Sequence, residues 1–186
     1  MSINKTISIL CQDKKSHGYN ISRNILLGIT QEQVHGNIYD LTDIDTTLTQ
    51  LTKSDAIIFG SPTFFGSVSS EIKAFMDKTT RIWKNRLWRN KIAASYTYSS
   101  SLNGDKMSVL QQLFIFAQQH GMIWVGLDLN SCTKNKNTPS NFLGSWIGLM
   151  SLTPSNNIYD IHIDQKTAQY FGSRIAKITK NINFHE

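Results

Sequence analysis

Short apolar runs separated by segments with a helical pattern restrict the fold of this chain more than any other feature. The runs lie at residues 5–11, 55–60, 91–97 and 122–127, with a weaker candidate at 37–41. Continuous apolar runs of this length are typical of parallel strands that are buried on both faces. Between and after the runs, apolar residues recur on one helical face: Ile72, Phe75, Met76 and Thr79; Leu110, Leu113, Phe114 and Ala117; Ala168, Phe171, Ile175 and Ile178.

Strands that alternate with helices predict an α/β fold, a doubly wound five-stranded parallel sheet with helices on both faces. A chain of 186 residues, 40% of them hydrophobic, suits one domain covering 1–186. For the strand order 2-1-3-4-5, a ligand binds beyond the carboxyl ends of the first and third strands. Residues 128–163 fit neither period, and we expect a long excursion with a functional or interfacial role.

The stretch "FGSPTFFGSVSSEIKAFMD", residues 59–77, breaks between the third strand and its helix at this predicted crevice. Phe64 and Phe65 lie in the break, and we expect them to form a wall for an aromatic ligand, beside Pro62 and Thr63. The alternative is that one or both turn inward as a hydrophobic staple for the helix. Under either interpretation Pro62 stiffens the loop, and Gly66, which has no side chain, allows a close approach to the backbone.

The loop after the first strand, in "QDKKSHGYNIS", has the composition of a phosphate site. Free N–H groups and the positive dipole end of a helix attract anions, and Lys14 and Lys15 add positive charge. The alternative is a simple helix cap. The predicted contacts are the hydroxyls and amides of Ser16, His17, Gly18, Tyr19, Asn20 and Ser22.

Two segments resemble a known family. "DAIIFGSPTFFGSVSSEIKAFMD", residues 55–77, is similar to the signature of flavodoxin-like NAD(P)H:quinone oxidoreductases of the tryptophan-repressor-binding-protein type, and "QQHGMIWVG", residues 118–126, resembles that family's H-H-G-M-x-x-V. The resemblance runs from about residue 54 to 180. It implies a flavodoxin-like fold, FMN as cofactor and hydride transfer from NAD(P)H through the flavin to a quinone or similar acceptor. It also implies a homodimer or homotetramer with active sites at subunit contacts.

The resemblance assigns further roles. The loop from Tyr98 to Gly104 is expected to contact the polar edge of the flavin; the alternative is a solvated turn. His120 matches a family histidine near the pyrimidine edge, where it would stabilise the reduced flavin; it could equally be a partner of the helix dipole. Trp83 matches a subunit contact near the flavin and would form the acceptor pocket with Phe64. No side chain is needed as a nucleophile. The expected loop contacts are Ser99, Ser100, Ser101, Asn103 and Gly104.

Three departures from the family keep other functions open. Phe64 replaces a usual arginine, Ser16 and His17 only approximate the S-x-x-G-H phosphate loop, and serines replace glycines in "YSSSLNG". A flavin-free binding or assembly module on the same scaffold therefore remains an alternative. A flavodoxin-type one-electron carrier is the other, although such carriers gain from an acidic face and this chain has a net charge of +6.

Composition argues against several other classes. In "RIWKNRLWRNK", residues 81–91, basic residues interleave with Trp83 and Trp88, which would suit nucleic acid, but no nucleic-acid motif supports it, and a solvated connection with packed tryptophans is favoured. The two cysteines and five histidines lack metal-ligand spacing, so no metal site is expected. No run approaches the ~20 apolar residues of a membrane span, and we expect a cytoplasmic protein.

Overall fold

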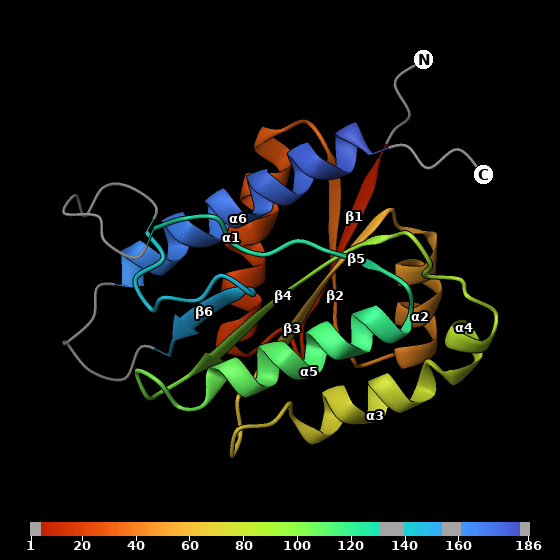
Figure 1. Cartoon of the computed structure of the whole chain (residues 1–186), viewed down its shortest axis with the longest axis horizontal. Helices are drawn as coiled ribbons and strands as arrows, with labels where there is room; N and C mark the ends of the chain where they lie inside the picture. Colours follow the sequence, from red (N-terminus) through yellow and green to blue (C-terminus); the bar gives the residue numbers. More distant parts are fainter. Residues whose placement is uncertain (1–4, 131–139, 154–160, 183–186) are drawn as a thin grey trace.

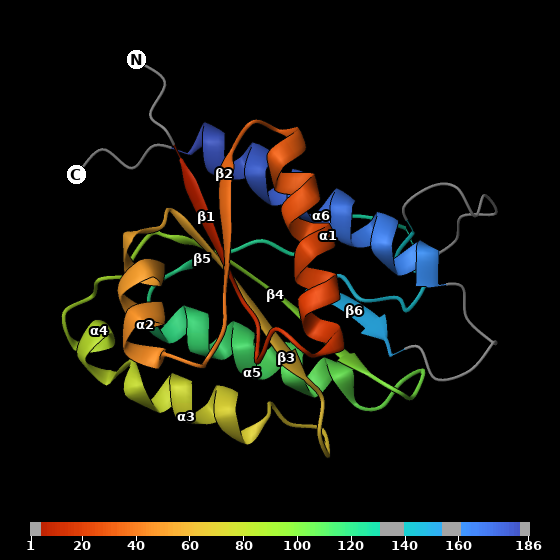
Figure 2. The same ribbon diagram turned by 180° about the vertical axis from the view of Figure 1, so that it is seen from behind.

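The computed structural model describes residues 5–130, 140–153 and 161–182. It has three layers, with a twisted parallel sheet in the middle and helices on both faces (Figures 1 and 2). Each strand pair in the sheet is parallel. The fold predicted from the alternation of strands and helices is therefore confirmed.

The strands of the sheet are β1 (Thr6–Leu10), β2 (His35–Tyr39), β3 (Ala56–Pro62), β4 (Ile92–Ser99), β5 (Ile123–Trp124) and β6 (Leu149–Leu152). Their order is β2-β1-β3-β4-β5, as predicted. β1 pairs with both β2 and β3, so the order of the strands reverses between β1 and β3. The crevice beyond their carboxyl ends is the place where ligands bind in folds of this type.

Two short strands share the outer side of β4. β5 pairs with the beginning of β4 at Ile92 and Ala93, and β6 pairs with its last four residues, 96–99. The chain leaves the sheet after β5 and returns as β6, which the sequence pattern does not predict. The predicted strand at 122–127 is thus shorter than expected, and part of the predicted excursion, residues 131–139 and 154–160, lies outside the described residues.

The helices are α1 (His17–Gln31), α2 (Ile44–Lys53), α3 (Ser70–Lys78), α4 (Thr80–Lys84), α5 (Lys106–Gln119) and α6 (Ile161–Asn181). They give each face of the sheet its own hydrophobic core. One core packs α1 and α6 against the sheet through residues such as Ile25 and Phe171, and the other packs α2, α3 and α5 through residues such as Phe75 and Leu113. Alternate residues of each strand point to opposite faces, which is why β1, β3 and β4 are buried along almost their whole length, whereas the edge strand β2 is only partly buried.

Helices α1 and α6 touch backbone to backbone, and they lie side by side in both views (Figures 1 and 2). A Cβ added to Gly28 would come within 1.8 Å of the Gln169 carbonyl oxygen, and one added to Gly172 within 2.0 Å of the Ile25 carbonyl oxygen. No side chain fits at either position. The two glycines therefore fix how closely the first and last helices approach.

Trp88, in the basic segment 81–91, is fully buried. It packs among aromatic rings that include Phe59 and Phe75, and its indole N–H donates to Thr52 Oγ1 at 3.1 Å. Trp83, by contrast, is half exposed on α4. The two tryptophans thus have different roles.

Among the described residues, none of the helices combines the length and apolar character needed to cross a bilayer.

Candidate functional site

The break after β3 forms a two-residue hairpin. Phe64 and Ser67 exchange both backbone hydrogen bonds, at 3.0 and 2.9 Å, and Phe65 and Gly66 lie between them with φ angles of 49° and 71°. Two consecutive positive φ angles are those of a type I′ turn, which favours Asn-Gly. The hairpin projects from the body of the molecule at the bottom of Figure 1.

Phe65 is an unusual residue for this turn. The left-handed region costs a residue with a Cβ roughly 1–2 kcal/mol, and the Phe65 ring is fully exposed to solvent, so no packing offsets that cost. Phe64 is also more than half exposed. A strained backbone that presents an exposed aromatic ring at a ligand crevice indicates a functional role. The hydrophobic staple considered for these phenylalanines is not formed by Phe65.

The hairpin is held against the first half of α5. The Gln112 side-chain amide donates to the Gly66 carbonyl at 3.2 Å and its oxygen accepts from the Ser67 hydroxyl at 3.2 Å. A Cβ built on Gly66 would lie 3.5 Å from the Asp105 Cβ. The hairpin and the loop after β4 therefore border the same space. Behind them, the buried Thr63 hydroxyl bonds to the Thr97 hydroxyl at 2.7 Å, and Pro62 ends β3.

The loop after β1 leaves the start of α1 without a side-chain cap. Ser16 is the N-cap residue, but its hydroxyl donates to the Asp13 carbonyl at 2.9 Å instead of capping the helix. The Asp13 carboxylate accepts from the Lys15 backbone N–H at 2.6 Å. The helix start can therefore receive an anion, but a carboxylate already occupies one backbone donor of the loop.

Gly18 and Tyr98 bring this loop and the end of β4 together. The Tyr98 ring packs over Gly18 and meets the His17 ring edge-on, with centroids 5.5 Å apart. Burial raises the pKa of Tyr98, although the Ser16 hydroxyl and the Gly18 N–H favour its phenolate form. The Tyr98 hydroxyl is therefore a neutral group beside the start of α1.

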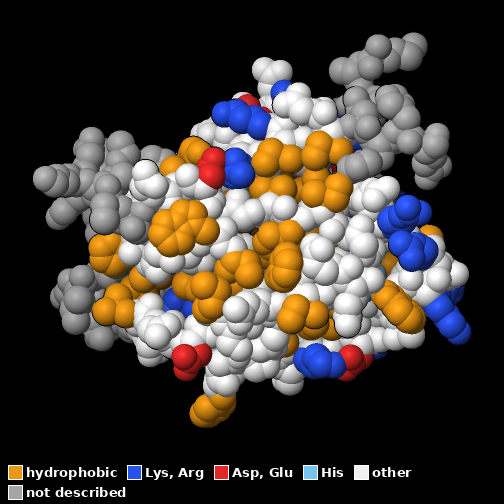
Figure 3. Space-filling view, viewed as in Figure 1, with side chains coloured by type: hydrophobic (Ala, Val, Ile, Leu, Met, Phe, Trp, Pro, Cys, Tyr) orange, Lys and Arg blue, Asp and Glu red, His pale blue; other side chains and the backbone are white. Residues whose placement is uncertain are grey.

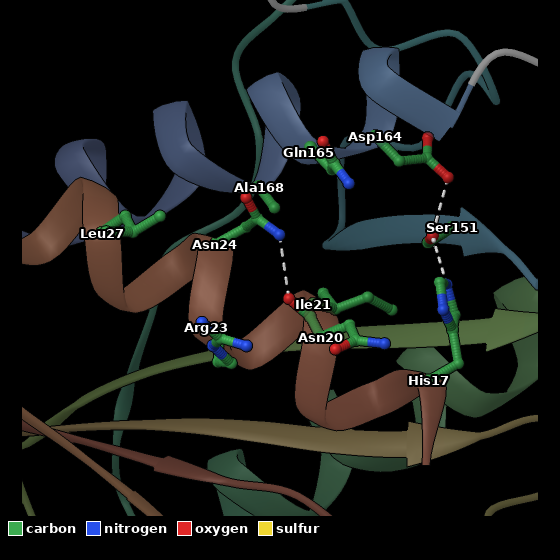
Figure 4. Close-up of a pocket in the computed structure, with 10 residues that line it drawn as sticks. All are labelled: His17, Asn20, Ile21, Arg23, Asn24, Leu27, Ser151, Asp164, Gln165 and Ala168. Carbon is green, nitrogen blue, oxygen red and sulfur yellow. Dashed lines mark hydrogen bonds between the residues drawn. The ribbon is translucent and has the colours of Figure 1, made fainter. Parts of the chain in front are cut away.

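His17 and Asn20 lie in α1 with side chains that line a cavity of about 410 Å³ between α1, β6 and α6 (Figure 4). His17 Nε2 lies 3.3 Å from the Ser151 hydroxyl, which donates to Asp164 Oδ2 at 2.7 Å. Burial lowers the pKa of His17.

The Tyr19 N–H already donates to the Ser16 carbonyl at 3.2 Å. Two of the predicted phosphate contacts are therefore used elsewhere. The Tyr19 N–H is bonded within the first turn of the helix, and the Asn20 side chain lines the cavity.

The loop after β4 is exposed at Ser100, Ser101 and Asn103. Beneath it, Lys106 is fully buried and donates to the Ser99 hydroxyl and to two loop carbonyls. Gly104 closes the loop with a φ of 54°. Sequence reasoning has no signal for Lys106, because a charged side chain in a predicted helix is normally expected to be exposed.

His120 lies at the end of α5 that is farthest from the loop after β4. α5 has 14 residues, so His120 lies about 21 Å from the loop that precedes the helix. It bonds through Nε2 to Thr79 Oγ1 at 3.0 Å, and burial lowers its pKa to about 4. His120 therefore does not contact a flavin held by the loops of its own chain. It shares a cavity of about 460 Å³ with Trp83. α4 and the end of α5 lie at the right of Figure 1, whereas the hairpin and the loop after β4 lie to the left.

Other chemistries have little support. Burial and the nearby Asp40 and Asp13 carboxylates raise the pKa of Cys11 to about 12, so its thiol stays protonated and is a poor nucleophile. Within residues 5–130, 140–153 and 161–182, no three His, Cys, Asp or Glu side chains form a group suited to a metal ion.

The residues at the crevice fit the FMN that the sequence resemblance implies. The uncapped start of α1 suits a phosphate, the exposed Phe64 and Phe65 rings suit a planar ring system, and the loop after β4 faces the hairpin. The Asp13 carboxylate opposes the binding of an anion. The structure thus brings together the predicted first loop, the hairpin and the loop after β4, and it separates Trp83 and His120 from them.

Comparison with known proteins agrees with this geometry. The sequence pattern of the NADPH-dependent FMN reductase family matches residues 15–134. Flavodoxin FldP of Pseudomonas aeruginosa is 34% identical over 139 residues, 72% of this chain and 74% of that protein. A NAD(P)H dehydrogenase (quinone) of Archaeoglobus fulgidus is 34% identical over 137 residues, 72% of this chain and 63% of that protein. The WrbA-like flavodoxin of Agrobacterium tumefaciens superposes with a TM-score of 0.73 at 25% identity, covering 95% and 98% of the two chains.

Proposed function

Because the chain belongs to the NADPH-dependent FMN reductase family, we propose that it transfers hydride equivalents from NAD(P)H through FMN to a quinone or a similar small acceptor. The family establishes the coarser part of this statement: the chain is a flavoprotein oxidoreductase that uses FMN and NAD(P)H. The quinone is our proposal, based on similarity to proteins named NAD(P)H dehydrogenase (quinone). Bound FMN supplies the redox chemistry, accepting a hydride and passing the electrons on.

The protein's own contribution is to bind and orient rings and to stabilise charge. The start of α1, with Ser16, His17 and Gly18, would hold the phosphate. The loop at 99–104, with Ser99, Ser100, Ser101, Asn103 and Gly104, would contact the polar edge of the ring system. Pro62, Thr63 and Gly66 shape the wall that carries the phenylalanines.

The observation that carries the proposal is Phe65. Its left-handed backbone and fully exposed ring are costly in a free turn, and a bound aromatic ring covering the side chain would offset that cost. An acceptor stacked on the same ring system would lie near Phe64. This accounts for two phenylalanines at a crevice where the chain itself cannot bury them.

We further propose that the active protein is a homo-oligomer, a dimer or a tetramer. Trp83 is half exposed and lies beyond α3, whose nine residues span about 13 Å. In an oligomer it would reach the acceptor pocket of a neighbouring subunit rather than its own. Hydrophobic side chains also gather on the face that carries α5 and the segment after β5 (Figure 3). Ile115, Phe142 and Trp146 are each more than half exposed, which suits a subunit contact.

The reaction is tested with the purified protein by titrating the apoprotein with FMN and FAD and then following NADPH and NADH oxidation with benzoquinone. We expect FMN to bind more tightly than FAD and benzoquinone to be reduced. Failure to bind FMN, or ten-fold tighter binding of FAD, would overturn the cofactor site. Binding of FMN without quinone reduction would overturn the acceptor alone.

The oligomer is tested separately by light scattering at micromolar concentration and by Trp83→Ala. We expect a dimer or tetramer and a raised KM for benzoquinone in the variant, with unchanged FMN affinity. Leu87→Ala, at another exposed hydrophobic residue of the same segment, is the matched control. A monomer together with an unchanged KM would return Trp83 to a role in surface packing.

A one-electron carrier is the second candidate, favoured by similarity to a protein named flavodoxin. The two functions differ in a measurable way. A carrier would exchange single electrons with a protein partner and would not oxidise NADPH with benzoquinone at a useful rate. The net charge of +6 favours the reductase, because positive charge stabilises the anionic reduced flavin.

A further inference from the structure

Lys106, the first residue of α5, is held in an energetically unfavourable position. Its side chain is fully buried, and its ammonium lies at the positive end of a helix dipole. Burial lowers its pKa to about 8. Nζ donates to Ser99 Oγ at 2.9 Å, to the Ser101 carbonyl at 2.6 Å and to the Leu102 carbonyl at 3.1 Å. The ammonium therefore determines the shape of the loop above it.

Peptide geometry carries the effect of Lys106 to the opposite side of the loop. In a trans peptide the carbonyl and the following N–H point in opposite directions. Since the Ser101 and Leu102 carbonyls turn inward to the ammonium, the N–H groups of Leu102 and Asn103 turn outward. Hydrogen bonds between described residues use neither of these two N–H groups, and both residues are exposed.

The C-terminal end of this loop borders the hairpin of the site. Asp105 lies next to the Gly66 end of the hairpin, and Gln112 of α5 bonds to the same hairpin. Two N–H groups that lie on the far side of these peptides from a buried positive charge can stabilise developing negative charge.

We propose, on the premise of the proposed function, that Lys106 is a positioning residue for the flavin. It holds the Leu102 and Asn103 N–H groups toward the polar edge of the ring system, and its charge stabilises the negative charge that reduction places there. The sequence "SSSLNGDK", residues 99–106, is then a serine-rich loop that a lysine keeps rigid, in place of the glycine-rich loop of the family.

The test compares Lys106→Met with the parent protein in FMN affinity and in two-electron midpoint potential. Methionine keeps most of the volume and removes the charge and the donors. We expect oxidised FMN to bind about ten-fold more weakly and the affinity for reduced FMN to fall by a further factor of about ten. That additional factor corresponds to a midpoint potential lower by about 30 mV. Lys53→Met, on the exposed face of α2, controls for the loss of one positive charge.

Ser99→Ala gives a second measurement, because it removes one acceptor and leaves the charge buried. We expect a smaller loss of affinity and little change in potential. If Lys106→Met folds and keeps both the affinity and the potential of the parent, the proposal is wrong, although the FMN site stands. If Lys106→Met fails to fold, an unchanged FMN affinity in Ser99→Ala decides against the proposal. If the parent itself binds no FMN, the proposed function fails first.

Discussion

The Tyr98 ring lies so close to Gly18 that a Cβ on the glycine would come within 2.7 Å of Tyr98 Cε1 and 3.0 Å of its hydroxyl oxygen. Only glycine allows the start of α1 to pack on the end of β4 in this way. The contact joins the loop after β1 to the strand that leads into the loop after β4.

Gly18→Ala is predicted to change stability with opposite signs in two backgrounds. In the parent chain the new methyl group collides with Tyr98, and we expect the free energy of unfolding to fall by about 1–2 kcal/mol. In a Tyr98→Ala chain the collision is absent, and the higher helix propensity of alanine at position 18 should raise the free energy of unfolding by up to about 1 kcal/mol. Denaturant unfolding of the four proteins measures both effects. The same change in both backgrounds would show that Tyr98 does not limit the position.

Asp13→Asn is predicted to tighten FMN binding by about five-fold to ten-fold, because it removes one negative charge near the phosphate and can still accept from the Lys15 N–H. Riboflavin, which lacks the phosphate, should bind equally to both proteins. Titration with the two flavins measures this, and Asp45→Asn, on the exposed face of α2, is the control. Equal gains for riboflavin and FMN would mean that Asp13 acts on loop structure and not on charge.

Phe65→Asn is predicted to stabilise the fold and to weaken the site. Asparagine suits the left-handed position of a type I′ turn, so the free energy of unfolding should rise by about 1 kcal/mol. FMN affinity should fall about ten-fold because the stacking surface is lost. Urea unfolding and flavin titration measure the two effects on one sample. A variant that binds FMN as tightly as the parent would remove Phe65 from the site.

Gly66→Val is predicted to impair flavin binding beyond its cost to folding. The φ of 71° at Gly66 makes valine cost about 1–2 kcal/mol, and the new side chain would project where the ring system approaches. Gly144 has a similar φ of 67°, and a Cβ added there would meet no atom within 4 Å, so Gly144→Val is the matched control. Equal losses of FMN affinity per folded molecule in both variants would make Gly66 a structural turn.

His120 is predicted to make stability depend on acid pH. Its folded-state pKa of about 4 lies below the unfolded value of about 6.5, so the folded state binds fewer protons between these values. The stability it contributes is complete above pH 6.5 and is lost as pH falls through 4, by roughly 3 kcal/mol in total. Unfolding free energies at pH 7, 5.5 and 4 should fall less steeply in His120→Gln, whereas His35→Gln, at an exposed site, should match the parent. Parallel profiles for parent and His120→Gln would contradict this.

The sheet can be predicted from the sequence because its signal is local. A parallel strand that is buried on both faces has a continuous apolar sequence. The runs that contain Ile7, Ile58 and Ala94 fit this pattern better than that of any other secondary-structure element. β6 has only four residues, too few for a periodic signal, and its place depends on the last residues of β4. A short edge strand that is paired by tertiary contact leaves no clear pattern in its own sequence.

The site is predictable where it depends on a break in a pattern. The phenylalanines at 64 and 65 interrupt the passage from strand to helix, which marks the hairpin region, although it does not reveal the strain at Phe65. The role of Lys106 cannot be predicted from the sequence, because it depends on the burial of the side chain. Hydrophobic periodicity predicts burial only for apolar residues. The role of His120 at a flavin stays a prediction, because a motif match does not show whether the flavin belongs to the same chain or to a neighbouring subunit.

The contact between α1 and α6 at Gly28 and Gly172 bears on how the molecule is assembled. The two helices lie far apart in the sequence, so their docking closes a loop that contains every strand and helix except β1. Contacts of such large sequence separation form late, because the chain entropy of closing them is lost before any packing is gained. The helix that would receive the phosphate therefore stays without its full support until α6 has docked. Cofactor capture should accordingly follow the slowest folding step, and a chain released before α6 is synthesised would expose the apolar face of α1.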